Sequence, residues 1–236
     1  MVLGWGLSGV SAQNAKNIVI DANAEVRQVA GFTAIEVSGA IDLYLSQGTE
    51  EGVAISASSG EIKERIRTEV RGATLQIYFD GKGLNWKKWG NHKMKAYVTF
   101  KTLTRLEASG ACNIRVTETI RLTDIKIELS GASDFTGNVA LSNLRLDASG
   151  ASNANISGTA DNATLNASGA CNIKAYNLKT NICKIDASGA SHIRITVEKE
   201  LNAQASGGST IFFKGNGLIR DISTSGGATV KRRTDD

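Results

Sequence analysis

The stretch from Leu146 to Ala154 reads Leu-Asp-Ala-Ser-Gly-Ala-Ser-Asn-Ala, and close copies of it recur through the second half of the chain. Each copy carries Ser-Gly-Ala or Ser-Gly-Gly, and successive copies begin 18 to 21 residues apart. The copies begin at Ser109, Ser130, Ser149, Ser168, Ser188, Ser206 and Ser225, with an earlier one at Ser38. Self-similarity at so constant a spacing predicts a repeat architecture, in which each copy folds into the same unit.

Aligned on the serine, the copies show apolar residues in alternate columns and polar residues between them. The columns three before, one before and five after the serine are apolar or small, as at Leu146, Ala148 and Ala154. A period of two predicts strands with one buried face. A repeat of about 19 residues is too short for a strand and a helix, or for a four-stranded propeller blade. We therefore predict an all-β fold, a single-chain β-solenoid of the parallel β-helix kind with about 19 residues per coil.

In such a solenoid the coils stack about 4.7 to 4.9 Å apart, so each column of the alignment becomes a ladder of similar side chains. The column two before the serine is mostly acidic, as at Glu128 and Asp147, and the column four before it is mostly basic, as at Lys126 and Arg145. Both columns are predicted to face solvent, so we expect their charges to neutralise one another. The glycine after the serine is predicted to form a sharp corner that a Cβ atom would obstruct.

The repeat divides the chain into a regular and a less regular part. Residues 101–230 are predicted to form the solenoid coils, and residues 231–236 a tail. Residues 23–100 are predicted to form a sheet-rich N-terminal cap, continuous with the coils, that covers the strand edges at one end. Residues 1–22 fit a leader remnant and flexible N-terminus, because the small residues that end at Ala12 suit a secretory cleavage site. An ordinary frayed terminus is the alternative.

The composition excludes two classes of function. The 27 Lys and Arg residues and 23 Asp and Glu residues give a formal net charge of +4, and the two signs are interleaved along the chain. This pattern is not the basic patch that is typical of nucleic-acid binding. No apolar run approaches the roughly 20 residues of a membrane-spanning helix. We therefore expect neither a nucleic-acid partner nor a transmembrane segment.

Three stretches of the chain carry a resemblance to a known family. They are Gly31–Ala40, Ala96–Phe100, and the repeated Leu-x-Ala-Ser-Gly-Ala-Ser/Cys-Asn-Ile that begins at Leu106. In these motifs the sequence resembles the putative auto-transporter adhesin, head GIN domain family of Gram-negative cell-envelope proteins, over most of its length. The resemblance implies an all-β, solenoid-like fold and an exported location, in the periplasm, at the outer-membrane surface or secreted. It carries over no catalytic residue.

The three cysteines fit the repeat as small buried side chains. Cys112 and Cys171 occupy the same column, where other copies have serine, and they lie three coils apart, roughly 14 Å at the sheet spacing. A disulfide needs Cα atoms within about 7 Å, so this pair should not be bridged. Cys183 lies in a different column. We predict three buried free thiols.

The histidines and the polar column after the corner suggest no catalytic or metal-binding constellation. His92 lies in a Gly-rich loop, and His192 replaces Asn in a column predicted to face solvent. The same column includes Asp134, Asn153 and Asn172, whose oxygens could hold a calcium ion as the alternative reading. Calcium normally needs several carboxylates around one point, and this stack has one. We expect no catalytic residue, metal or cofactor.

The loop within residues 81–95 departs most from the repeat pattern. The candidate ligand-binding residues in it are Trp86, Trp89, Asn85, Asn91, Lys87 and Lys88. Two indoles in a polar loop can stack on sugar rings while Asn and Lys bond hydroxyl or acidic groups. The alternative is that the indoles fold back and cover the apolar end of the solenoid.

These observations favour an exported, non-enzymatic cell-envelope protein with an adhesin-like or binding role toward an envelope or host glycan, or a protein. Two other classes stay open. A carbohydrate-active lyase or hydrolase is one, because β-helices also host such enzymes, although these need converging carboxylates. A structural or assembly module, whose coil ends dock other subunits, is the other.

Overall fold

The computed structural model describes residues 21–83 and 93–233 of the chain. In these ranges the chain forms one short helix and a succession of hydrogen-bonded strands. The N-terminal elements are β1 (Glu25–Arg27), β2 (Ala34–Gly39), β3 (Ile41–Gln47), β4 (Gly52–Ala57), α1 (Gly60–Arg65), β5 (Ile66–Arg71), β6 (Thr74–Phe79) and β7 (Met94–Phe100). The later elements are β8 (Arg105–Gly110), β9 (Asn113–Val116), β10 (Ile120–Leu129), β11 (Asp134–Ala148), β12 (Asn153–Ala167), β13 (Asn172–Ala187), β14 (His192–Ala205), β15 (Thr210–Lys214), β16 (Leu218–Thr224) and β17 (Thr229–Arg232).

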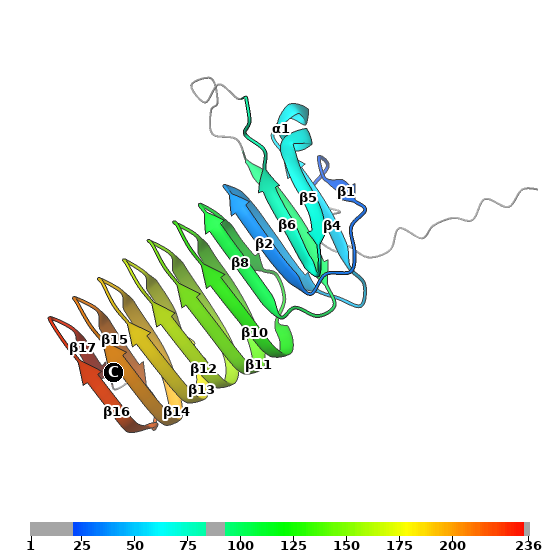
Figure 1. Ribbon diagram of the computed structural model, residues 1–236. Helices are drawn as coiled ribbons and strands as arrows, with labels where there is room; N and C mark the ends of the chain where they lie inside the picture. The colour runs from blue at the N-terminus through cyan, green and yellow to red at the C-terminus, as the bar shows by residue number, and fades with distance from the viewer. Residues whose placement is uncertain (1–20, 84–92, 234–236) are drawn as a thin grey trace, which may run out of the picture.

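From β8 onward the strands wind into stacked rungs, each paired in parallel with the rungs before and after it (Figure 1). Leu146 of β11 lies opposite Leu165 of β12, and Leu165 lies opposite Ile185 of β13. The same register places Ser38 of the earlier copy opposite Ser109. Equivalent positions of the repeat therefore lie directly above one another, which confirms the predicted all-β solenoid.

Alternate residues of each rung point into one apolar core. In β11 the buried hydrophobic residues are Phe135, Val139, Leu141, Leu144, Leu146 and Ala148. The alternation changes phase at Ser142 and Asn143, so the two halves of the rung direct their apolar side chains to the same interior. Full burial of a Leu, Ile or Phe side chain contributes roughly 1.5 to 3 kcal/mol, so these columns provide most of the stability.

The glycine corner has a physical requirement that the structure makes explicit. Gly150 has a left-handed backbone conformation, with φ of +72°. The next residue, Ala151, donates its backbone N–H to the carbonyl oxygen of Gly131 in the preceding rung at 2.7 Å. A Cβ atom on Gly150 would stand 2.4 Å from that same oxygen, so only glycine fits. This confirms the predicted corner.

The two ends of the stack differ. At the N-terminal end β4 pairs antiparallel with both β1 and β7, and β5 pairs antiparallel with β6 (Figure 1). At the other end β16 is exposed along its whole length, including Leu218, Ile219 and Ile222. In residues 21–83 and 93–233 the helix α1 has only six residues, and no helix of these ranges is long and apolar enough to cross a membrane.

Candidate functional site

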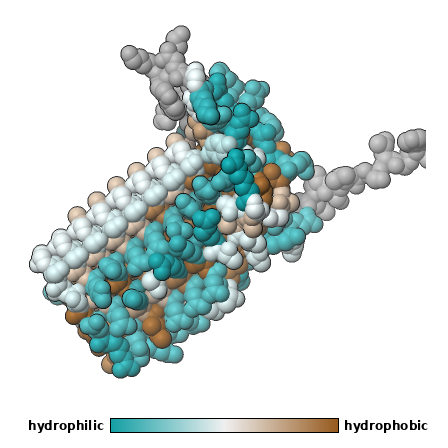
Figure 2. All heavy atoms as spheres, viewed as in Figure 1, coloured by the Kyte–Doolittle hydropathy of each residue, from teal (hydrophilic) through white to brown (hydrophobic). Residues whose placement is uncertain are grey.

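The predicted loop site lies outside the described part of the chain. Its residues, Trp86, Trp89, Asn85, Asn91, Lys87 and Lys88, fall within residues 84–92, between β6 and β7. Their role in ligand binding stays a prediction. The described residues provide two other long surfaces, one on each side of the glycine corner. Figure 2 shows how bands of similar hydropathy follow the stack along its length.

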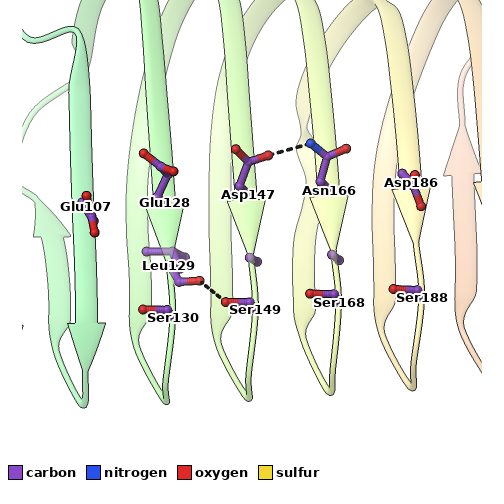
Figure 3. A pocket seen from close by; sticks show the side chains of 12 residues that line it. Glu107, Glu128, Leu129, Ser130, Asp147, Ser149, Asn166, Ser168, Asp186 and Ser188 are labelled. Carbon is purple, nitrogen blue, oxygen red and sulfur yellow. Dashed lines mark hydrogen bonds between the residues drawn. The ribbon is translucent and has the colours of Figure 1, made fainter.

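The first surface, here called the carboxylate face, consists of the columns two and four residues before the serine. Its columns are Glu36, Glu107, Glu128, Asp147, Asn166, Asp186, Gln204 and Ser223, and Ala34, Arg105, Lys126, Arg145, Thr164, Lys184, Asn202 and Asp221. Over eight rungs this face has six carboxylates and four cations. A shallow groove of about 420 Å³ follows its acidic column and the neighbouring serine column (Figure 3).

Ion pairs neutralise three of the four cations of the carboxylate face. Arg105 lies 2.7 Å from Glu107, Lys126 lies 2.7 Å from Glu128, and Arg145 lies 2.9 Å from Asp147. Lys126 also approaches Asp147 of the next rung at 3.6 Å. These lateral and diagonal pairs confirm the predicted neutralised lattice.

The carboxyl of Asp147 illustrates the electrostatics of this face. Partial burial acts to raise its pKa, but hydrogen bonds from Arg145 and Asn166 outweigh burial and lower the pKa below its usual value of 3.8. The Asn166 Nδ2 atom donates to Asp147 Oδ1 at 2.6 Å (Figure 3). A hydrogen bond to Glu128 likewise raises the pKa of Lys126. The groups therefore stay ionised and paired at neutral pH.

The second surface, here called the cation face, consists of the columns four and six residues after the serine. Its columns are Asp42, Asn113, Asp134, Asn153, Asn172, His192, Thr210 and Thr229, and Tyr44, Arg115, Thr136, Asn155, Lys174, Arg194, Phe212 and Lys231. Over the same eight rungs it has four cations and two carboxylates. A shallow groove of about 430 Å³ crosses it beside Arg115, Asn155 and Lys174.

The two faces differ in how their charges are satisfied. Within the part of the chain that the structure describes, none of the four cations of the cation face forms an ion pair. The carboxylates of this face accept hydrogen bonds from amides instead, Asp42 from Asn113 and Asp134 from Asn153, both at 2.7 Å. Among the described residues, these cations thus have no carboxylate within ion-pair distance.

Aromatic side chains lie at the N-terminal end of the column that contains these cations and one rung before its C-terminal end. Tyr44 stacks on Tyr97 of β7, with ring centroids 5.1 Å apart and planes at 18°. Burial and a hydrogen bond to Asp21 at 2.8 Å raise the pKa of Tyr97, so its hydroxyl stays protonated. Near the other end the Arg233 guanidinium lies 4.3 Å from the centroid of Phe212.

The thiols lie in the core, as predicted. Cys112, Cys171 and Cys183 are buried and free, and burial raises the pKa of all three, to about 12 for Cys183. The Cys171 thiol donates to the Ser168 carbonyl oxygen at 3.2 Å, as the Ser152 hydroxyl does to Ser149 in the preceding rung at 2.8 Å. The thiol thus takes over a hydroxyl's role at the corner.

His192 is exposed within the cation face, which agrees with its predicted outward position. The column that sequence analysis considered for calcium contains Asp134, and one oxygen of this carboxylate accepts a hydrogen bond from Asn153. In residues 21–83 and 93–233, no cluster of three or more His, Cys, Asp or Glu side chains is arranged to hold a metal ion.

Stacked rungs, glycine corners and open ladders of polar side chains define the class: a β-solenoid with long, solvent-facing surfaces. The chain belongs to the family described as putative auto-transporter adhesin, head GIN domain, which matches residues 31–217. This confirms the resemblance that the repeated motif carries. No curated protein matches the chain.

Solved structures with the same fold come from species of Bacteroides and Parabacteroides. A putative adhesin from Bacteroides fragilis is 24% identical, with a TM-score of 0.81, and the alignment covers 89% of this chain and 96% of that one. A putative lipid binding protein from Parabacteroides distasonis is 21% identical, with a TM-score of 0.64 and coverage of 89% and 98%. A putative adhesin from Parabacteroides distasonis is 18% identical, with a TM-score of 0.67 and coverage of 89% and 96%. At these identities the comparisons show the fold.

Sequence reasoning missed the cation face. Its cations stand six residues after the serine, at Arg115, Lys174, Arg194 and Lys231. The side chains of this column vary in chemistry, because Thr, Asn and Phe occupy other rungs. The column therefore does not stand out as basic in an alignment of the copies. A comparison between columns could have revealed the cation face. On the carboxylate face a mostly acidic column lies two residues from the basic one, whereas the column two residues from these cations is mostly neutral.

Proposed function

We propose that this protein is an exported, non-enzymatic binding module of the cell envelope with an adhesin-like role. The observation that carries the proposal is the stacking of equivalent polar residues over eight rungs, on faces that stay open to solvent. Such ladders repeat a chemical group about every 4.8 Å along one line, so they suit an extended partner better than a compact one. Membership of a family described as adhesins supports this reading.

The arrangement of carboxylates argues against the alternative of a carbohydrate-active enzyme. A glycosidase needs one carboxyl with a raised pKa as general acid and a second one poised across the scissile bond. On the carboxylate face Glu107, Glu128 and Asp147 are ion-paired, and the pKa of Asp147 is lowered rather than raised. These carboxylates are therefore suited to fixing the register of the strands and keeping the protein soluble.

A glycan array probed with the full chain tests the binding role. We expect retention on a subset of glycans and no release of products from any polysaccharide tested. Turnover of a polysaccharide would contradict the non-enzymatic role. The variants Trp86→Ala and Trp89→Ala test whether the loop takes part in binding, and fractionation of Gram-negative cells that express the protein tests export.

A second candidate function, an assembly module, is favoured by the exposed strand β16 near the C-terminal end of the stack. The strand β16 leaves Leu218, Ile219 and Ile222 at 63%, 49% and 36% exposure. Unpaired strand edges with apolar side chains are sites where chains associate. Light scattering over a range of protein concentrations distinguishes the two roles, because an assembly module forms oligomers without any ligand.

A further inference from the structure

The cation face contains a run of five rungs without any carboxylate. From the rung of Asn153 to the rung of Lys231, its two columns contain Lys174, Arg194 and Lys231, together with Asn, Thr, His and Phe side chains. Across the described residues none of these three cations forms an ion pair. The carboxylate face of the same solenoid pairs three of its four cations at 2.7 to 2.9 Å. This fold thus allows ion pairs between outward columns, and among the described residues these three cations of the cation face make none.

The unpaired cations lie close enough to repel one another. Lys174 is directly opposite Arg194 in the parallel pair of β13 and β14, one rung away, or about 4.8 Å between strands. Like charges directly opposite one another in a sheet are destabilising. Arg194 is also held in place, because its guanidinium donates to the Asn172 side chain at 3.5 Å. A negatively charged group bound over these side chains would remove the repulsion.

The neutral members of the face are hydrogen-bonding groups. Asn153, Asn155 and Thr210 lie in the same two columns as the cations. Amides and hydroxyls bond the hydroxyl groups of sugars, and the column ends at the half-buried, stacked side chains of Tyr44 and Tyr97. From Tyr97 to Lys231 the column crosses eight rung spacings, about 38 Å, which suits a polymer that lies along the stack.

We infer that the cation face binds an anionic polysaccharide, laid along the solenoid axis, with Lys174, Arg194 and Lys231 contacting its carboxylate or sulfate groups. This inference rests on the proposed binding function and names its face and ligand class. A polysaccharide fits better than a lipid bilayer, because the large apolar residues that the structure leaves exposed lie elsewhere. These residues are Val26, Ile182, Leu218, Ile219 and Ile222.

The test measures binding of the full chain to immobilised dextran sulfate, polygalacturonate and unsulfated dextran by biolayer interferometry. We expect binding to the two anionic polymers, no binding to dextran, and an affinity that falls as salt rises, because exposed charges are screened beyond about 10 Å at 0.1 M salt. The variant Lys174→Gln, Arg194→Gln, Lys231→Gln should bind at least tenfold more weakly.

The matched control is Lys179→Gln, Lys184→Gln, Lys199→Gln. It removes the same number of charges from exposed lysines outside the cation face, which also have no ion pair among the described residues. We expect its affinity to stay within twofold of the parent chain. Circular dichroism checks that both variants keep the fold.

Three results would overturn the inference. They are no binding to either anionic polymer, equal losses in both variants, and tighter binding to phosphatidylglycerol vesicles or single-stranded DNA than to the polysaccharides. If neutral glycans on the array are bound and neither anionic polymer is, the inference fails and the proposed function stands. If no glycan, neutral or anionic, is retained, both fail.

Discussion

At the scale of single residues, the stacked corner glycines show how a single Cβ atom limits which residue can occupy a position. In most copies of the corner a small residue follows the glycine, and its N–H extends a hydrogen-bond ladder from rung to rung. The carbonyl oxygen that accepts each bond occupies the space where a glycine Cβ would stand. The residue that follows the glycine can therefore vary, whereas the glycine itself cannot be replaced without a clash.

The variant Gly150→Ala should be strongly destabilised. Its φ is +72° and its new Cβ would meet the Gly131 carbonyl oxygen at 2.4 Å. We expect a loss of about 2 to 4 kcal/mol in the free energy of unfolding, from backbone strain and the clash together. The control is Gly208→Ala, at the position where other copies have Ala and where the nearest atom is 3.7 Å away. Urea unfolding should place it within about 0.5 kcal/mol of the parent.

The cysteines allow a second comparison, between Cys171, whose column has serine in other copies of the repeat, and Cys183, whose column does not. Cys171→Ser restores the side chain found in neighbouring rungs and keeps the hydrogen bond to Ser168, so stability should change by less than about 1 kcal/mol. Cys183→Ser puts a hydroxyl between the buried side chains of Ala163 and Leu201, where the Thr180 side chain is a hydrogen-bonding neighbour, and the desolvation of the hydroxyl should cost about 1 to 3 kcal/mol. Urea unfolding measures both changes in stability, and an equal loss in the two variants would contradict the different surroundings assigned to the two thiols.

In the native parent chain all three buried thiols should resist Ellman's reagent.

At the scale of the elements, the outward columns are joined across rungs as well as within them. Asn166 donates to Asp147, and Lys126 reaches both Glu128 and Asp147. Exposed pairs of this kind contribute only about 0 to 1 kcal/mol each. Their combined effect is to fix the register of parallel strands whose buried columns are chemically alike.

The contribution of Asp147 should depend on pH in a defined direction. Because its pKa in the folded chain lies below the usual 3.8, its stabilising effect is fully present above pH 3.8 and is lost as the pH falls from 3.8 through the lower pKa of the folded chain. Asp147→Asn should therefore unfold at a lower urea concentration at pH 7, by less than about 1 kcal/mol in stability. The gap between parent and variant should close below pH 3.8. A gap that is constant from pH 7 to pH 2 would show that the ion pairs of Asp147 are not its source.

At the scale of the whole molecule, the solenoid is a stack in which each rung contacts mainly its neighbours. The central rungs β11 to β14 pair with one another along most of their lengths. Stability in such a stack is approximately a sum of rung and interface contributions. At the N-terminal end β4 pairs antiparallel with β1 and β7, whereas β16, near the C-terminal end, is exposed along its length.

Removal of one whole repeat should therefore leave a folded protein. Deleting residues 153–171 joins Ser152 to Asn172 and preserves the Ser-Gly-Ala-Ser-Asn sequence of the corner. We expect unchanged far-UV circular dichroism per residue and an unfolding temperature only a few degrees lower. Deleting residues 153–162 instead removes about half a rung, so the inward columns no longer match and the chain should not fold. Similar behaviour of the two deletions would contradict the rung structure.

Much of the architecture could be predicted because it repeats. The spacing of the corner serines gave the rung length, and alternation around them gave the buried columns, since parallel stacking forces equal positions to coincide. The inference that Cys112 and Cys171 are unbridged followed from the same geometry. The candidate loop at Trp86 and Trp89 has no repeat to anchor it, and its residues lie outside the described ranges.

The sequence by itself thus determined the solenoid, its glycine corners and its neutralised acidic column, because each of these features recurs in several copies at a nearly constant spacing. Only the tertiary structure decided that Lys174 and Arg194 form no ion pair among the described residues, and that β16 is left exposed. The physical reason is that a column of the repeat gives the neighbours directly above and below a residue, whereas ion pairing and exposure also depend on which side chains of neighbouring columns come within reach.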